Sequence, residues 1–211
     1  MKICVLADVH FDHPNCYREE FLEAISLIAP KMDVIVLNGD FLDSTSNKTR
    51  KLFEEFLELA KKENFLTKLF FVRSSSHHDG VLDEFWDLAM NDYAEFSTNI
   101  GKVICIHGNK VGLHLDEKGS EELAAIKAKE ILIEKGRKWL PKITQEHHVI
   151  FSHLHRRFYN ERKRVYGTGC WIPAKDRRSE KVTMIIDDED KNDTISNNTL
   201  AQLREKYQQK H

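Results

Sequence analysis

The sequence predicts an α/β fold in which helices cover a mostly parallel sheet and a second sheet packs against the first. Two observations predict it. Short apolar runs alternate with segments whose apolar residues recur at helical spacing, the pattern of a parallel sheet with helices on its faces. In addition, a cluster containing Asp or His follows most of the apolar runs, as expected where strands end at a common edge.

The first half of the chain carries the clearest alternation. Its apolar residues indicate two amphipathic helices, one over Tyr17–Ala29 and one over about Lys48–Lys62. Three apolar runs are expected as buried strands: Lys2–Ala7, Val34–Leu37 and Leu69–Val72. The order strand, helix, strand predicts that these strands run parallel.

The second half predicts a second sheet and one further long helix. This helix extends from about Ser120 to Lys138, with Ser120 as its N-cap. The strands expected here are Glu95–Thr98, Lys102–His107, His148–Ser152, Arg164–Gly167 and Lys181–Ile186. We expect one domain over residues 1–186. A polar tail over residues 187–211 follows, in which Thr199–Gln208 could form a short surface helix.

The composition indicates a globular protein. Of 211 residues, 41% are hydrophobic and 31% are charged, which argues against disorder. A net charge of -2 gives no general attraction to nucleic acids or membranes, so nucleic acid is not indicated as a partner. No apolar run has the length of a membrane span. The four cysteines form no CxxC pair and are interpreted as reduced thiols, so we expect a cytoplasmic location.

Metal-ligand residue types recur along most of the chain. Each group alone is a weak signal, since Gly-Asp usually marks a turn and a single His usually has a structural role. His-x-His is more specific, because extended backbone places both rings on one side. Together, groups that each follow a strand indicate a two-metal hydrolytic centre at one sheet edge. The groups are Asp8-Val9-His10, Gly39-Asp40, His77-His78-Asp79, His107-Gly108 and His153-Leu154-His155.

The order of these groups resembles the calcineurin-like metallophosphoesterase superfamily. That family's pattern is D-x-H, G-D, G-N-H-[DE], H and G-H-x-H. The resemblance covers about residues 3–173 and includes Gly167–Pro173, which is similar to the N-T-G-S-W-x-P segment of smaller members. It implies a four-layer α-β-β-α sandwich of two mixed β-sheets flanked by helices, with the metal site at one end.

The resemblance also implies a ligand set. Asp8, His10 and His155 would hold one metal ion, and His107 and His153 would hold the other. The carboxylate of Asp40 would bridge the two ions. The implied cofactor is therefore a pair of divalent metal ions.

The third group departs from the family pattern, because Ser76 and His77 stand where the family has Gly and Asn. The preferred alignment places His77 on the second metal and His78 in the catalytic position, oriented by Asp79. The rival alignment makes His77 catalytic and leaves Ser76 at the ligand position. An imidazole in place of an amide oxygen favours Mn²⁺, Fe²⁺, Zn²⁺ or Ni²⁺ over Mg²⁺.

The family chemistry is hydrolysis of a phosphate ester by a hydroxide that bridges two cations. His78 would donate a proton to the leaving oxygen. A phosphodiester or pyrophosphate bond in a small substrate is favoured over a monoester. Arg73, Arg156 and Arg157 are candidate substrate-binding residues. For the last two, a solvated hairpin is the alternative.

A non-catalytic interpretation competes with this one. The same fold also serves as a metal-binding scaffold for protein interaction in relatives that lack the catalytic His. In this chain His78 and the other metal positions are filled, which favours catalysis. Self-association into a homo-oligomer is left open by the sequence.

Overall fold

The first of two sheets carries the N-terminal strands. The computed structural model describes residues 1–74, 76–85, 87–113, 120–173, 181–187, 189 and 195–208. Sheet order is β11-β10-β1-β2-β3-β4, with β1, β2, β3 and β4 mutually parallel and β10 and β11 antiparallel to their neighbours. The strands are β1 (Lys2–Leu6), β2 (Val34–Asn38), β3 (Leu69–Val72), β4 (Met90–Asn91), β10 (Val182–Asp187) and β11 (Ile195–Thr199).

The second sheet is formed by the middle of the chain. Its order is β5-β6-β7-β9-β8, and β6, β7 and β9 are mutually parallel. The hairpins β5–β6 and β8–β9 are antiparallel. The strands are β5 (Tyr93–Thr98), β6 (Gly101–Ile106), β7 (His148–Phe151), β8 (Arg157–Asn160) and β9 (Val165–Thr168).

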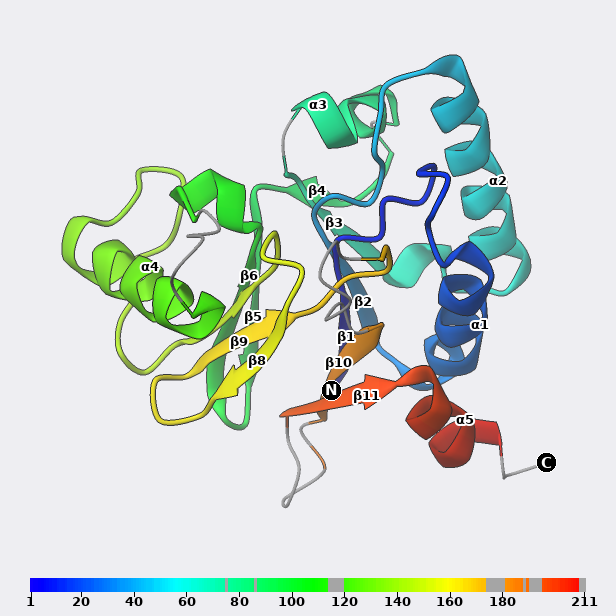
Figure 1. Cartoon of the computed structure of the whole chain (residues 1–211). Coiled ribbons are helices and arrows are strands. Elements are labelled where there is room, and N and C mark those ends of the chain that lie inside the picture. The colour runs from blue at the N-terminus through cyan, green and yellow to red at the C-terminus, as the bar shows by residue number, and fades with distance from the viewer. Residues whose placement is uncertain are drawn as a thin grey trace.

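Helices cover the outer face of each sheet, so the layers run helix, sheet, sheet, helix (Figure 1). The helices α1 and α2 lie on the first sheet and α4 lies on the second. The bounds are α1 (Arg18–Ile28), α2 (Asn47–Lys62), α3 (Ser76–Asp79), α4 (Glu121–Lys135) and α5 (Leu200–Gln208). Short 3₁₀ turns occupy Ala29–Lys31, Leu66–Lys68, Gly80–Glu84 and Gly108–Val111. The predicted four-layer sandwich is confirmed.

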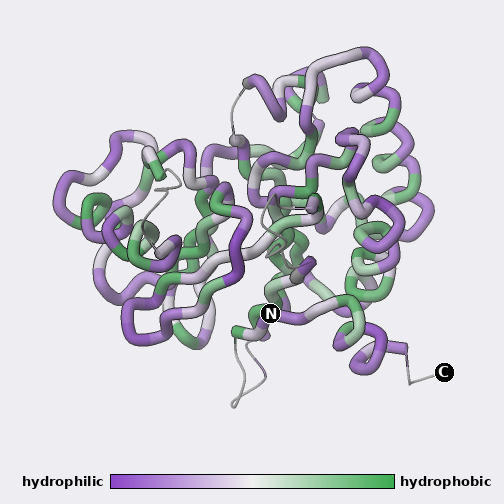
Figure 2. Tube along the Cα trace, viewed as in Figure 1, coloured by the Kyte–Doolittle hydropathy of each residue, from purple (hydrophilic) through white to green (hydrophobic). Residues whose placement is uncertain are grey.

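Three apolar clusters hold the layers together. One lies between the sheets and includes Val5, Val36 and Ile150, all fully buried. The other two lie under the helices, where Phe21 and Phe56 face the first sheet and Leu132 faces the second. Figure 2 shows this hydrophobic material inside the sandwich and polar residues around it. Among the described helices, none is long and apolar enough to cross a membrane.

The end of the chain differs from the expected polar tail. The strand β11 pairs with β10 from Ile195 to Thr199 and so extends the first sheet. Helix α5 packs against α1, and Leu203 is fully buried in the same cluster as the α1 core residues. Residues 195–208 thus pack on the first sheet and on α1, through the pairing of β11 with β10 and through the apolar side chains of Ile195, Leu200, Leu203 and Tyr207.

Lys129 ties α4 to the second sheet. Its ammonium donates hydrogen bonds to the carbonyls of Gln145 (3.1 Å), His147 (2.6 Å) and Lys163 (2.8 Å). The residue is only 2% exposed. These carbonyls belong to the connections before β7 and β9, so one side chain fixes both connections to the helix.

Replacing Lys129 with Met should lower the free energy of unfolding by about 3 kcal/mol, because buried carbonyls lose a charged donor. Chemical denaturation followed by circular dichroism measures this. Lys127→Met is the matched control: it lies on the exposed side of the same helix, and its effect should stay below about 0.5 kcal/mol. Equal effects of the two substitutions would contradict this account of Lys129.

Candidate metal centre

Loops after the parallel strands bring six of the predicted ligands together. Strands β1 and β2 of one sheet and β6 and β7 of the other end at the same edge of the sandwich. Of the three potential metal-binding groups that the described residues form, two share Asp40, and within each group the ligand atoms lie within 4.8 Å of one another. One group is Asp8, His10, Asp40 and His155, and the other is Asp40, His107 and His153. The carboxylate of Asp40 is common to both.

The ligand backbone is strained. Seven described non-glycine residues have a positive φ, and five of them are ligand candidates: Asp8, His10, Asp40, His153 and His155. A left-handed conformation costs a non-glycine residue about 1 kcal/mol or more, and such strain concentrates at functional sites.

Hydrogen bonds between the first two loops hold this conformation. The amide of Asp8 donates to the Gly39 carbonyl (3.1 Å), and the amide of His10 donates to the Asp40 carbonyl (3.0 Å). The Phe11 amide continues the series by donating to the Phe41 carbonyl (2.7 Å). The β1–β2 pairing thus continues past the ends of the strands into the site.

Asp79 anchors the loop that follows β2, a role different from the predicted orientation of His78. Its buried carboxylate accepts the backbone amides of Asp40 (3.0 Å), Phe41 (3.0 Å) and Leu42 (3.2 Å). It also accepts the amide and the hydroxyl of Ser74 (3.2 and 2.6 Å). The sequence predicts that this carboxylate orients His78. Its position between the loops after β2 and β3 instead suits it to hold Asp40 in place.

The electrostatics of the group favour a cation. Burial lowers the pKa of His107, but hydrogen bonds to Asp40 and Asp8 outweigh this effect and raise it to about 10. The same contact has the opposite effect on Asp40. Burial raises the pKa of this carboxyl, but the hydrogen bond with His107 brings the pKa below its usual value. Asp8 and Asp40 are 0% and 3% exposed. Two buried carboxylates so close together destabilise the fold unless positive charge lies beside them.

Two buried polar atoms of the site lack a hydrogen-bond partner among the described residues and are available to bind a metal ion. His10 Nε2 and Asp40 Oδ1 are buried and have no hydrogen-bond partner within the described part of the chain. On His10, Nδ1 lies 3.0 Å from Asp43 Oδ1, which leaves Nε2 for an ion. On His107, Nδ1 lies 2.7 Å from Asn109 Oδ1, which likewise leaves Nε2. The donor set therefore fits divalent cations.

Asp43 is a site residue that the sequence interpretation missed. It forms a third potential ligand group with His10 and His78, and its Oδ1 lies 3.8 Å from His78 Nδ1. The His78 ring lies 5.4 Å from the His10 ring, so His78 borders the metal-binding group. The carboxylate near His78 is thus that of Asp43. The available signal was its spacing, three residues after Asp40, which places both on the same loop.

His77, predicted as a ligand of the second metal, lies apart from the other candidate ligands. It is exposed and belongs to none of the three groups that the described residues form. Its ring lies 5.1 Å from that of His78 on the short helix α3, which turns His77 outward while His78 faces His10.

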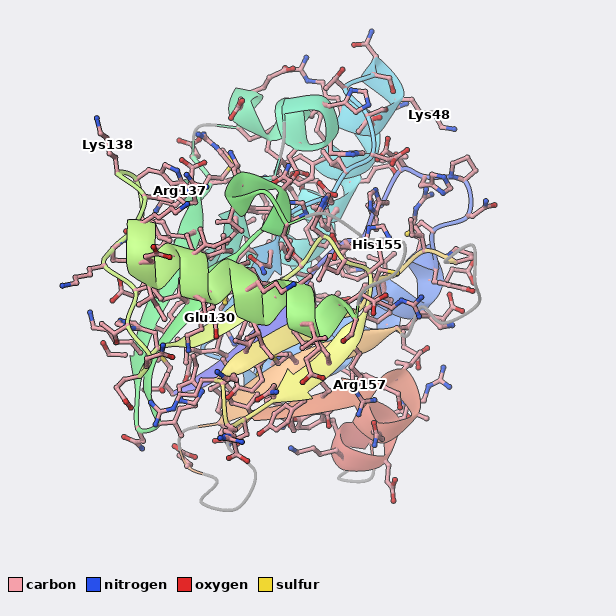
Figure 3. All side chains as sticks on the ribbon, turned by 60° about the vertical axis from the view of Figure 1, so that its left-hand side comes forward. Lys48, Glu130, Arg137, Lys138, His155 and Arg157 are labelled. Atoms are coloured by element: carbon pink, nitrogen blue, oxygen red, sulfur yellow. The ribbon has the colours of Figure 1, made fainter. Side chains whose placement is uncertain are left out.

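Two of the three predicted arginines form ion pairs with acidic side chains outside the ligand groups. Arg73 pairs with Asp83 (3.0 Å), and Arg156 pairs with Glu121 at the start of α4 (3.1 Å). Arg157 is exposed on β8, as Figure 3 shows together with His155 in the preceding loop.

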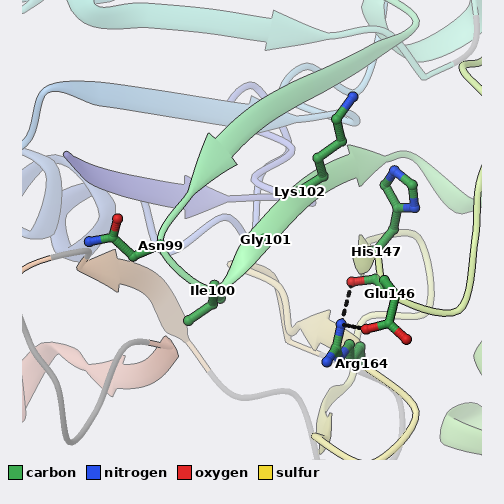
Figure 4. A pocket seen from close by; sticks show the side chains of 7 residues that line it. All are labelled: Asn99, Ile100, Gly101, Lys102, Glu146, His147 and Arg164. Carbon is green, nitrogen blue, oxygen red and sulfur yellow. Dashed lines mark hydrogen bonds and ion pairs between the residues drawn. The ribbon is translucent and has the colours of Figure 1, made fainter.

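A pocket of about 450 Å³ lies at the opposite ends of β6 and β7 (Figure 4). Its Arg164 contacts the carbonyl and the carboxylate of Glu146. Its Lys102 pairs with Glu95 (2.6 Å). Because these cations are neutralised and the ligand groups lie at the other edge, the pocket is not part of the metal centre.

A family model described as calcineurin-like phosphoesterase matches residues 1–185. The chain belongs to this family. The resemblance drawn from the ordered Asp and His groups is thereby confirmed. Members of the calcineurin-like phosphoesterase family are metal-dependent hydrolases, and the clustered Asp and His side chains of this member could bind divalent ions.

Solved structures share the fold of this calcineurin-like phosphoesterase. The phosphoesterase Yfce from E. coli aligns with a TM-score of 0.57 at 15% identity, over 95% of this chain and 100% of that chain. An archaeal phosphodiesterase aligns with a TM-score of 0.56 at 18% identity, over 94% and 99%. Vps29 from Entamoeba histolytica aligns with a TM-score of 0.52 at 14% identity, over 94% and 97%. A search of curated proteins finds no match.

Gly39 makes the close approach of the two sheets possible. A Cβ atom at this position would lie 2.3 Å from Cδ2 of His107, and the residue has a φ of +81°. Any side chain would therefore displace a fully buried ligand candidate while also straining the backbone.

Gly39→Ala should lower the free energy of unfolding by roughly 2–4 kcal/mol, as strain and overpacking combine, and should weaken metal binding. Gly112→Ala is the matched control, because Gly112 has a φ of +73° with nothing within 4 Å of its Cβ position. It should cost about 1 kcal/mol and leave metal binding intact. Thermal denaturation and calorimetric Mn²⁺ titration measure both effects. A Gly39→Ala protein that binds Mn²⁺ like the wild type would contradict this account.

Proposed function

We propose that this chain is a phosphodiesterase that uses two divalent cations sharing the carboxylate of Asp40. The observation that carries the proposal is the meeting of two ligand groups at that buried side chain. Asp8, His10 and His155 complete one site, and His107 and His153 complete the other. With four imidazoles in the set, Mn²⁺, Fe²⁺, Zn²⁺ and Ni²⁺ are favoured over Mg²⁺.

The ions, when bound, supply an activated water and neutralise charge on the phosphate. The protein contributes the remaining groups. His78 donates a proton to the leaving oxygen, since its ring borders His10 and is partly open to solvent, with a side chain 30% exposed. Asp43 orients that imidazole from 3.8 Å, a distance that a small movement of either side chain closes to a hydrogen bond.

Charge around the site favours a diester over a monoester. A diester carries one negative charge, whereas a monoester carries close to two at neutral pH. The additional charge needs further cationic donors, yet Arg73 and Arg156 are already paired with Asp83 and Glu121. A small phosphodiester therefore suits the site better than a monoester.

A protein-interaction module is the second candidate. Two Vps29 structures, with TM-scores of 0.52 and 0.51, align over 94% of this chain. On the surface of this chain, Leu123 and Ile131 of α4 are 56% and 44% exposed and could contact a partner or a second copy.

Hydrolysis of bis-p-nitrophenyl phosphate with added Mn²⁺ separates these functions. We expect release of p-nitrophenol from the diester at a rate at least tenfold above that from p-nitrophenyl phosphate, and loss of both activities after chelation. Protein that binds Mn²⁺ but hydrolyses neither compound would contradict catalysis and support the interaction module.

Metal content tests the ligand assignment. His153→Ala should lower the bound Mn²⁺ from two ions to about one per chain, because it removes one of three groups at its site. His77→Ala should leave the content unchanged, since this side chain is exposed. Elemental analysis after dialysis measures both, and loss of an ion in His77→Ala would restore His77 as a ligand.

A further inference from the structure

The carboxylate of Asp12 lies at the centre of a hydrogen-bond network beside the metal centre. Its Oδ1 accepts the backbone amide of Asp43 at 2.5 Å. Its Oδ2 accepts the hydroxyls of Ser44 (2.9 Å) and Thr49 (2.6 Å). All three donors belong to the segment that leads from β2 into α2, so a single carboxylate fixes the backbone on both sides of the Asp43 side chain.

The network continues the pairing between the first two loops. That pairing runs from Asp8–Gly39 through His10–Asp40 to Phe11–Phe41, all by backbone hydrogen bonds. At the next step the Asp12 side chain takes over and holds the Asp43 amide. The position of Asp43 is therefore set from the same loop that carries His10.

The N-terminus of α2 holds one end of this hydrogen-bond network in place. Ser46 caps the helix by accepting the amide of Thr49 (3.2 Å), and the Thr49 hydroxyl lies 2.9 Å from that of Ser46. Thr49 is 1% exposed.

We propose that Asp12 is a positioning residue for the phosphoesterase reaction. It holds Asp43 where that carboxylate contacts His10 Nδ1 at 3.0 Å and faces His78 Nδ1 at 3.8 Å. The inference rests on the proposed function of His78 as the proton donor. Without Asp12, the Asp43 segment is released, and His78 loses the group that orients it.

The leaving group distinguishes this role from a general loss of structure. p-Nitrophenolate leaves without protonation, whereas the more basic phenolate depends on a proton donor. Loss of a correctly oriented His78 should therefore slow diphenyl phosphate far more than bis-p-nitrophenyl phosphate. A defect in folding or metal content would slow both equally.

The experiment compares kcat and KM of the full chain for these two diesters with saturating Mn²⁺. Asp12→Ala should lower kcat at least tenfold for diphenyl phosphate and less than threefold for bis-p-nitrophenyl phosphate, with KM and metal content unchanged. Asp12→Asn should recover most of the loss, because its amide oxygen can still accept the Asp43 amide and its NH₂ can donate to the hydroxyl oxygens of Ser44 and Thr49. Equal losses on both substrates, or none, would overturn the proposal.

Two further variants support the comparison. Asp33→Ala is the matched control, since this carboxylate also accepts a backbone amide, that of Lys2 at 2.7 Å, but at the other end of the sheet. It should leave the ratio of the two rates unchanged. If Asp12→Ala fails to fold, the double variant Ser44→Ala/Thr49→Val removes two of the three donors and should shift the ratio in the same direction. An unchanged ratio there would count against the proposal.

NMR ring resonances of His10 and His78 report whether the Asp43 side chain has moved, and the measurement does not require turnover. We expect both to change in Asp12→Ala and to stay constant in Asp33→Ala. Unchanged resonances would overturn the role of Asp12 even in an active enzyme. A wild-type protein that hydrolyses neither diester, but whose resonances respond as expected, would instead overturn the proposed function and keep the structural role.

Discussion

The buried carboxylate of Asp40 is the point on which the site depends. It comes from the first sheet, yet its Oδ2 lies 3.3 Å from His107 Nε2, which the second sheet supplies. Asp79 fixes the Asp40 amide, and the Asp40 carbonyl accepts the His10 amide. A change in the packing between the sheets would separate the two ligand groups that share Asp40. The packing between the two sheets therefore supports the candidate metal centre.

The strained backbone of the loops lowers the stability of the fold, so other contacts have to compensate for it. Left-handed backbone at five ligand candidates lowers stability, and two buried carboxylates lower it further unless positive charge is near. Buried anchors such as Asp79 and the apolar contacts between the sheets offset these costs. A bound cation would add to the stability, because it would interact with the folded ligand set and not with the unfolded chain.

Much of this arrangement was predictable from sequence. The continuous apolar run Val34–Leu37 and the helical spacing of apolar residues over 48–62 define a strand and a helix. Residues that follow parallel strands meet at one edge of the sheet. Three edge strands escaped prediction: β4, β8 and β11. Strand β8 is surrounded by charged residues, and β11 is the polar sequence Ile-Ser-Asn-Asn-Thr, so neither carries a clear pattern of alternation. Their pairing is decided by neighbours that are distant in the sequence.

The third loop was the hardest part of the site to predict, for a physical reason. Sequence order places His77, His78 and Asp79 next to one another, but one helical turn sends neighbouring side chains in different directions. Consequently His77 is exposed, His78 borders His10, and Asp79 is buried beneath the Asp40 loop. The role of Asp43 depends on contacts across the loops, which spacing alone could only suggest.

A crystal structure with Mn²⁺, with anomalous diffraction recorded near the Mn absorption edge, tests the central claim most directly. The account predicts two anomalous peaks about 3.5–4 Å apart on either side of the Asp40 carboxylate. One peak should be ligated by Asp8, His10 and His155, and the other by His107 and His153. A single peak, or a pair of ions that does not share Asp40, would contradict it.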